Sequence, residues 1–447
     1  MSSYLLATML LAAAPPCGPL DLDTALGLAV IRSDEVAIRQ AELSSAHADE
    51  ALARALRIAP IANATVVTGP SPEAHGSVTF SPDSNRALTG LRPFGRVEVQ
   101  VVQPLYTWGR IDAASEAARA GIGARESLVQ DTISHVQLRV AQLYWGVSLA
   151  RRLLAVADDV KGALSQADEH IREALAAGDT DISPADRYRV DLFRGVVNGR
   201  TAEAQKGLEL AKLGLAATLG LSAPKLQLKE APLDPPAAEL PDRDAVLAAA
   251  QRQRPDLAAL GDAILARDAE VKAEQAAAKP QFFIAGQFSY SYAPNRDLQL
   301  NPWVHDPFND LSLGAVLGFR QDLALPMLSA RAQKAMAERA TLERQRAGLS
   351  RLVEVQVDGA LAELKAAQAR HAAAQASLGS GKALFRSTGL DFAAGLTDAK
   401  TIIESYSLYV ESQVAAAQAA YDLVVARARL QQVAGAAPRK GVACELQ

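Results

Sequence analysis

The sequence has few aromatic side chains and no long apolar run. Aromatic residues make up 5% of the 447 residues, whereas hydrophobic residues together make up 49%. Much of that fraction is alanine, which favours helices and buries little surface. The composition therefore favours long, closely packed helices over bulky globular cores. Beyond the N-terminal segment no stretch approaches the roughly twenty apolar residues of a spanning helix, so a membrane role would have to depend on β-strands.

Basic stripes and catalytic motifs are lacking too. The net charge is −4, and no cluster of lysine and arginine indicates a nucleic-acid partner. The six histidines are scattered, without the spacing of a metal site. The glycines around Lys382 lack the upstream glycine of a phosphate loop. We therefore expect no enzyme activity, cofactor or nucleic-acid binding.

The N-terminus predicts export. A short apolar run, Leu5 to Ala14, ends in alanines before two prolines, as the core and cleavage site of a secretory signal would. No lysine or arginine precedes it. We expect a signal peptide over residues 1–16. The two cysteines, Cys17 and Cys444, lie near opposite ends of the chain.

A long internal repeat organises the rest of the chain. Residues 25–60 align without a gap onto 245–280, and both segments resemble helices that stop at a proline, Pro60 or Pro280. The order of elements that follows is the same in each half. We predict a first repeat over 20–220, a proline-rich connector over 221–242, a second repeat over 243–435 and a tail over 436–447.

Each repeat contains two segments with the alternation of β-strands. Polar side chains alternate strictly with apolar or aromatic ones over Arg96 to Val101 and Gln287 to Tyr292, as in a strand whose two faces meet different solvents. Segments rich in glycine, proline, asparagine and aspartate separate the strands of each pair. The predicted strands cover about 61–68, 95–105, 281–292 and 311–323.

A helical pattern of roughly seventy residues follows each pair of strands. It runs from about Gly109 to Ala177 and from about Met327 to Thr388. Such a helix is on the order of 100 Å long, far beyond a globular domain. Tip turns at 178–184 and 389–397 lead into returning helices, so each repeat ends in a long helical hairpin.

Four membrane strands cannot close a barrel, since about eight are needed. Three copies would supply twelve strands by cyclic symmetry and would place the helices side by side in a ring. The fold class is therefore mainly α with a membrane β-barrel part: a homotrimer with four strands per protomer, a 12-stranded barrel and a long helical barrel.

Aromatic side chains are concentrated near the predicted strands. An interfacial girdle of a membrane barrel would have this distribution, whereas an ordinary core cluster is the alternative. The expected girdle residues are Tyr106, Trp108, Phe288, Tyr290, Tyr292 and Trp303.

The first strand-to-helix junction carries a family resemblance. Gln103, Pro104, Leu105 and Gly109 match the QPL-then-glycine signature at which a strand turns into the long helix of TolC-like proteins. The chain resembles this outer membrane efflux protein family over nearly its whole length. The second half departs from the signature, with Gln321-Asp322-Leu323 at the corresponding place.

The resemblance implies a passive, trimeric outer-membrane duct whose helical end lies in the periplasm. Its partners would be outer-membrane lipid, a periplasmic adaptor (membrane fusion protein) and an inner-membrane pump, in a tripartite efflux or type I secretion system. Drugs, metals and proteins all stay open as cargo. A soluble or exported coiled-coil scaffold is the alternative. Some relatives are lipid-anchored, but the prolines before Cys17 make a poor lipidation signal.

In such channels, acidic residues at the helical tips narrow the entrance. By position, the candidates here are Asp186, Asp398 and Glu404. A ring of carboxylates in a narrow pore would favour cations. The alternative is that these residues merely stabilise helix N-termini.

Overall fold

The structure is a computed structural model that describes residues 16–17, 19–76, 90–177, 184–221, 226–230, 232–235, 239–299, 301, 303, 306–394, 396–437 and 445–446. The chain forms two compact units. The first comprises Met1–Leu43, Arg125–Ala259 and Arg346–Gln447, and the second comprises Ser44–Ala124 and Leu260–Gln345. Most of the expected signal peptide, residues 1–15, and most of the first tip turn, residues 178–183, lie outside the described residues.

Helices dominate the described chain. They are α1 (Leu22–Arg32), α2 (Asp34–Ile58), α3 (Arg110–Ala177), α4 (Pro184–Thr218), α5 (Arg243–Gln253), α6 (Pro255–Ala277), α7 (Leu325–Ala393) and α8 (Ala399–Val433). The helices α3 and α7 have 68 and 69 residues, which corresponds to about 100 Å each. Among the described residues, no helix has the length and hydropathy needed to cross a membrane.

The helix that precedes each strand pair is interrupted, whereas the sequence predicts one continuous helix. The interruptions are at Ser33 and Arg254, which have nearly the same extended backbone angles. At Arg254 the cause is local, because the following Pro255 disfavours helical geometry in the residue before it.

The second tip turn is shorter than predicted. We expect it over 389–397, but α7 continues through Gly389 to Ala393 before the chain reaches α8. A glycine inside a helix costs only about 1 kcal/mol. Contacts between α7 and α8 offset this, among them the hydrogen bond between the hydroxyls of Thr388 and Ser405 at 2.6 Å.

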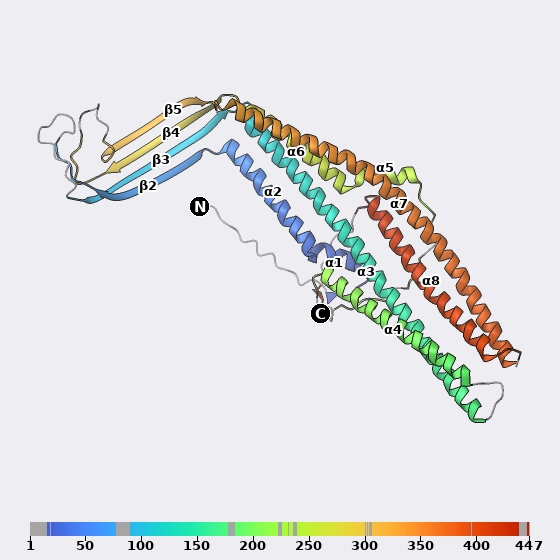
Figure 1. The fold of residues 1–447 in the computed structure, drawn as a ribbon. Coiled ribbons are helices and arrows are strands. Elements are labelled where there is room, and N and C mark those ends of the chain that lie inside the picture. Colours follow the sequence, from blue (N-terminus) through green and yellow to red (C-terminus); the bar gives the residue numbers. More distant parts are fainter. Residues whose placement is uncertain are drawn as a thin grey trace. The chain divides into compact units, whose positions relative to one another are not determined.

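Four strands form one antiparallel sheet in the second unit. They are β2 (Ile61–Ser71), β3 (Arg92–Tyr106), β4 (Gln281–Tyr292) and β5 (Asp310–Arg320), in that spatial order (Figure 1). The helices of this unit join one end of the sheet, and the β2–β3 and β4–β5 connections lie at the other end. A further short parallel pair joins β1 (Pro16–Cys17) and β6 (Glu445–Leu446).

The fourth strand ends three residues before the predicted Leu323. Asp322 accepts a hydrogen bond from the Ala324 amide at 2.9 Å, and the Leu325 amide donates to the Leu323 carbonyl at 2.8 Å. This local turn of the aspartate side chain competes with the strand. It places the start of α7 at Leu325.

Small aliphatic side chains build the core of the first unit. In one cluster Val136 and Val140 of α3 pack with Leu215 of α4 and with the buried face of α1. In a second cluster Val353 and Val357 of α7 pack with α5 and α8. These helices can approach one another closely because many of the side chains between them are alanine and valine, which are short.

Candidate functional site

The sheet has one apolar face, which the strand register defines. Directly opposed residues of antiparallel strands point to the same face. One row across the sheet runs from Val66 to Val97, then to Tyr290 and Leu311. The same face carries Ala62, Ala64, Thr68, Val99, Val101, Gln103, Phe282, Ile284, Phe288, Tyr292, Leu313, Ala315, Leu317 and Phe319.

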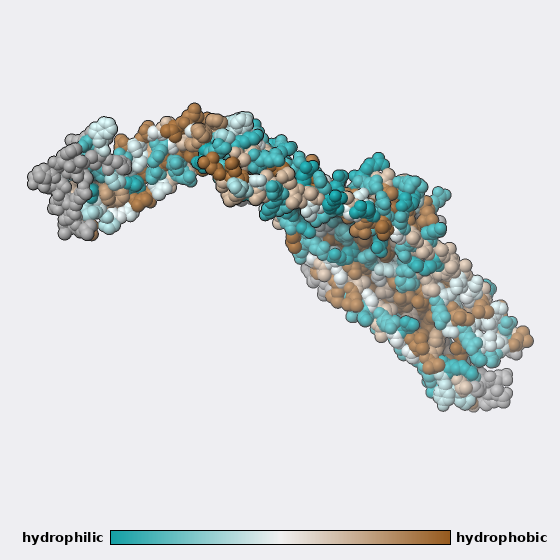
Figure 2. Space-filling model, turned by 45° about the horizontal axis from the view of Figure 1, so that its top comes forward, coloured by the Kyte–Doolittle hydropathy of each residue, from teal (hydrophilic) through white to brown (hydrophobic). Residues whose placement is uncertain are grey.

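Much of this apolar face is exposed. Leu313 is 84% exposed, Leu317 73% and Val66 72%. Hydrophobic surface over the sheet is visible as brown in Figure 2. Contiguous exposed apolar surface on a water-soluble protein is normally limited to small patches. The apolar face therefore indicates a non-aqueous environment or a partner.

The opposite face of the sheet is mainly polar. Glu98 and Gln287 hydrogen-bond across neighbouring strands at 3.1 Å. The polar members include Asn63, Thr65, Arg96, Glu98, Gln100, Gln281, Gln287, Ser289, Ser291, Asp310, Ser312 and Arg320, and the apolar ones include Ile61, Val67, Val102, Phe283 and Val316. A sheet with these two faces could separate a hydrocarbon phase from water.

The two outer strands have open edges. Within the described part of the chain, β2 pairs only with β3, and β5 pairs only with β4. Each edge presents a row of backbone groups that could pair with a further strand. These edges would be costly in lipid unless another strand covers them.

The strand-to-helix signature forms a bulge followed by a tight turn. Pro104 lies opposite Phe283 and Tyr106 lies opposite Phe282, so the intervening Leu105 has no cross-strand partner. Proline has no amide hydrogen to donate and is tolerated at such a bulge. Gln103 donates its side-chain amide to the Pro104 carbonyl at 3.1 Å.

The turn itself uses two residues with positive φ. Trp108 has φ 55° and Gly109 has φ 81°, immediately before α3 begins at Arg110. The left-handed conformation costs a residue other than glycine about 1–2 kcal/mol. Contacts of the indole offset this cost: it donates to the Pro280 carbonyl at 2.7 Å and stacks edge-on with Tyr106 at 5.1 Å.

The second strand-to-helix junction also contacts the link between α6 and β4, through a different side chain. Gln321, after β5, donates its side-chain amide to the Ala278 carbonyl at 3.3 Å. Both junctions therefore bind the link between α6 and β4. The departure from the signature in the second half replaces an indole by an amide and loses the positive-φ turn.

The six expected girdle residues occupy different levels of the sheet. Tyr106 and Trp108 lie at the end next to the helices, whereas Tyr290 and Tyr292 approach the opposite end. Phe288 lies within β4, opposite Val99 and Leu313. Trp303 is 93% exposed in the β4–β5 connection.

Two further aromatics at the helix end were not among the expected girdle residues. Phe282 and Phe319 lie opposite each other on β4 and β5, with ring centroids 6.3 Å apart. Their positions in the alternating pattern were the available signal, because each shares the parity of its strand's apolar residues.

The expected entrance carboxylates all have local partners. Asp186, in the first turn of α4, has a side chain that is 8% exposed and pairs with Arg189. Asp398 is the N-cap of α8 and accepts from the Thr401 hydroxyl at 2.6 Å and amide at 2.9 Å. These bonds, the hydroxyl first, hold the pKa of Asp398 below its usual range.

Glu404 has a side chain that is 63% exposed and lies 3.8 Å from Lys400. A more buried acidic residue was not predicted. Asp168 of α3 is 9% exposed and lies within 4 Å of three arginines, Arg172, Arg187 and Arg194. The Arg172 pair has helical i,i+4 spacing and was visible in the sequence, whereas the two arginines of α4 required the hairpin.

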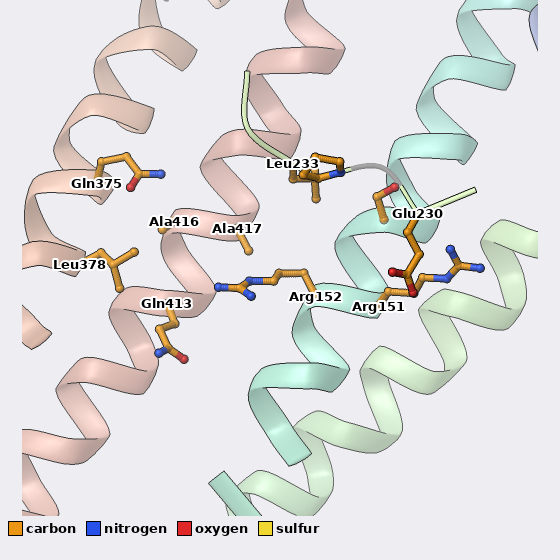
Figure 3. A pocket seen from close by; sticks show the side chains of 11 residues that line it. Arg151, Arg152, Glu230, Leu233, Gln375, Leu378, Gln413, Ala416 and Ala417 are labelled. Carbon is orange, nitrogen blue, oxygen red and sulfur yellow. The ribbon is translucent and has the colours of Figure 1, made fainter. Parts of the chain in front are cut away.

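A cleft of about 550 Å³, lined by both polar and apolar side chains, lies within the first unit (Figure 3). Arg152 extends from α3 toward Gln413 and Ala417 of α8, while Gln375 and Leu378 of α7 line the far side. Among the described residues that line this cleft, none forms a nucleophile–base pair. No group of three histidine, cysteine or carboxylate residues in the described ranges could hold a metal ion.

Three solved structures illustrate what the whole chain is similar to. The outer membrane channel CmeC of Campylobacter jejuni matches with a TM-score of 0.75 and 13% identity, over 95% of this chain and 87% of that one. The outer membrane channel MtrE of Neisseria gonorrhoeae matches with 0.73 and 17%, over 94% and 90%. The outer membrane protein VceC of Vibrio cholerae matches with 0.71 and 15%, over 94% and 97%.

By contrast, comparison of the sequence finds no match to a family model or to a curated protein. The structural likeness nevertheless covers nearly the whole chain. The chain therefore has the fold of TolC-like outer-membrane channels, as its resemblance to that family predicted.

Proposed function

We propose that this chain is one protomer of a passive exit duct in the outer membrane, which passes small molecules or proteins from the periplasm to the outside. The two-faced sheet carries the proposal. Its apolar face would contact lipid, and its polar face would line a water-filled pore. Neither role requires catalysis, and the channels with the same fold are described as outer-membrane channels.

The open edges of the sheet support a trimer. If β2 of one protomer pairs with β5 of the next, three four-stranded sheets close into a twelve-stranded barrel. A barrel has no edges, so every backbone group of the strands finds a partner within the hydrocarbon layer. The internal repeat is also proposed, since each half supplies two strands and a long helical hairpin.

The helices support a second, periplasmic part of the duct. At about 100 Å, α3 and α7 are long enough to extend the conduit far from the membrane. A passive duct needs an energised pump, so we propose an inner-membrane transporter and a periplasmic adaptor as partners. The system would be a tripartite efflux or type I secretion system.

The entrance of the duct would be at the helical tips. Asp398 and Glu404 are the better candidates for a cation-favouring ring, because Asp186 is buried against Arg189. Their cap and ion-pair contacts do not prevent a second role, since a carboxylate can accept several hydrogen bonds.

The test combines mass and conductance. The full chain is purified from detergent-solubilised membranes, the mass of its protein component is measured, and it is then reconstituted in planar bilayers. We expect a trimer with stable pores whose cation preference falls in Asp398→Asn and Glu404→Gln. A monomer or dimer without conductance would overturn the duct and favour the coiled-coil scaffold.

A further inference from the structure

The two loop segments beyond the free end of the sheet are joined by side-chain and backbone contacts. One segment, residues 72–76 with Gly90, belongs to the β2–β3 connection. The other, residues 293–299, belongs to the β4–β5 connection. They are more than 200 residues apart in the chain for each of the contacts that follow. We call the two together the mouth segments.

Asn295 is the centre of these contacts. Its side-chain amide donates to the Ser71 carbonyl and to the Gly90 carbonyl, both at 2.8 Å. Ser71 ends β2, and Gly90 lies just before β3, so one side chain of the second connection holds both ends of the first. Ser71 is fully buried. Asn295 is therefore placed to hold the β2–β3 connection closed at its base.

Backbone bonds extend the junction beyond Asn295. The Ala74 amide donates to the Asn295 carbonyl at 3.3 Å, and the Asp297 amide donates to the Ala74 carbonyl at 3.1 Å. Ala74 is 7% exposed. Arg296 donates to the Pro72 carbonyl at 3.1 Å and stacks over Phe308 at 4.1 Å. The mouth segments are thus a built interface and not a chance approach of two loops.

The interface contains one histidine, His75, the type of side chain whose ordinary pKa is closest to neutral pH. The His75 ring is 2.5 Å from the Glu73 carboxylate and 3.5 Å from the Asp297 carboxylate. The other Asp297 oxygen accepts from the Gly76 amide at 3.0 Å. Arg296 is the remaining charged side chain of the described mouth segments. A protonated His75 would therefore bridge an acidic residue of its own connection and one of the other connection.

The two carboxylates beside His75 favour its protonated form. The hydrogen bond of His75 with Glu73, and then that with Asp297, raises the pKa of His75 above its usual value of 6.5. The Gly76 amide, and then His75, lowers the pKa of Asp297, so this group stays ionised in neutral and mildly acidic solution. The bridge is complete below pH 6.5, is lost as the pH rises through the raised pKa of His75, and weakens again in strong acid.

We propose that the mouth segments form a latch that ties the β2–β3 connection to the β4–β5 connection at the outer opening of the duct, held by Asn295 at all pH values and tightened by protonated His75 in mildly acidic solution. The position of the latch at the outer opening of the duct rests on the proposed function. The latch itself depends only on contacts inside the second unit.

Hydrogen exchange tests the latch on the full chain in detergent. Protection of residues 70–76 and 293–299 is measured at about pH 5.5 and pH 8.5 and corrected for intrinsic exchange. We expect roughly two- to fivefold more protection at the lower pH, as befits exposed ion pairs. His75→Gln should abolish that difference, and Asn295→Ala should lower protection at both pH values.

His371→Gln is the matched control, since His371 is a half-exposed histidine on α7 whose ring lies 3.4 Å from the side-chain amide of Gln375. It should leave the pH difference intact. Protection of α7 reports whether each variant has folded. A pH difference that survives in His75→Gln, or normal protection in Asn295→Ala, would overturn the latch.

Conductance then separates the latch from the proposed function. If the protein forms pores, we expect wild-type conductance to be lower at about pH 5.5 than at pH 8.5, and His75→Gln to be insensitive over that range. Pores without this difference would overturn the role of the latch at the mouth. Absence of any pore would instead overturn the proposed duct, while the exchange result would still decide whether the latch exists.

Discussion

The sheet of the second unit and the helices of the first unit place their apolar side chains in opposite ways. In the helices, large aliphatic residues such as Leu215 and Val357 are fully buried between neighbouring helices. In the sheet, residues of similar size such as Leu313 and Leu317 stay more than 70% exposed. Both regions are rich in apolar side chains, but only the helices cover them within the chain.

This difference shows that the two regions are stable in different surroundings. A helical core is completed by folding in water, since burial itself removes apolar area from solvent. The apolar face of the sheet is completed only when something outside the protomer covers it. Substitutions that are equivalent in chemistry should therefore have effects that depend on lipid in one region and not in the other.

The largest effect is expected in the helical core. Leu215→Ala removes a fully buried side chain from the cluster of α1, α3 and α4, and should destabilise the first unit by about 2–5 kcal/mol. Helical circular dichroism during denaturant unfolding measures this loss. The loss of unfolding free energy should be the same in detergent and in lipid vesicles. A loss that depends strongly on lipid would contradict the proposed difference between the helical core and the sheet.

A charge on the apolar face should act only through lipid. Leu313→Arg should cost about 2–4 kcal/mol if this residue lies near the middle of the bilayer. The neighbouring Ser312→Arg, on the polar face, should cost far less. Folding into vesicles in urea measures both variants, and equal costs would contradict the assignment of the two faces.

The junction between sheet and helix should show an intermediate effect. Gly109→Ala adds a side chain at φ 81° where no atom lies within 4 Å, so its cost is conformational and should be about 1–2 kcal/mol. Gly162→Ala, inside α3 and equally free of neighbours, should be neutral or stabilising by up to about 1 kcal/mol. Thermal unfolding of the two variants gives the comparison.

The smallest effect on stability is expected at the helical tip. Asp398→Ala removes the N-cap of α8 and should lower the melting temperature slightly at neutral pH. Because its pKa is depressed, the wild-type advantage is present above pH 3.8 and fades as the pH falls through the lower, folded-state pKa. Melting curves from about pH 7 to pH 2 follow this convergence, with Asp391→Ala as a control that removes an exposed acid without a cap.

Local patterns predicted much of this architecture. Alternation located the strands, and long helical runs located α3 and α7, because side-chain periodicity reflects directly which face meets which solvent. The proline at 255 could have predicted the helix break at Arg254, but the corresponding break at Ser33 has no such signal. The Leu105 bulge was also hidden, since it depends on the register with β4.

The candidate site was less predictable where its contacts join distant residues. The bond from Trp108 to Pro280 and those from Asn295 to Ser71 and Gly90 cross between the two halves of the chain. Sequence spacing holds no information about such pairs when only one sequence is considered. The role of Asp398, Asp186 and Glu404 at an entrance stays a prediction, because their contacts within one protomer are those of ordinary helix ends.

Residue-by-residue accessibility along β5 tests the central claim most directly. Single spin labels at positions 310–319, in a chain whose two cysteines are replaced by serine, are exposed to oxygen, which enriches in lipid, and to a water-soluble nickel chelate. We predict oxygen maxima at Leu311, Leu313, Ala315, Leu317 and Phe319, with chelate maxima at the residues between them. Equal access of the chelate to both sets would contradict a lipid-facing sheet and, with it, the proposed outer-membrane duct.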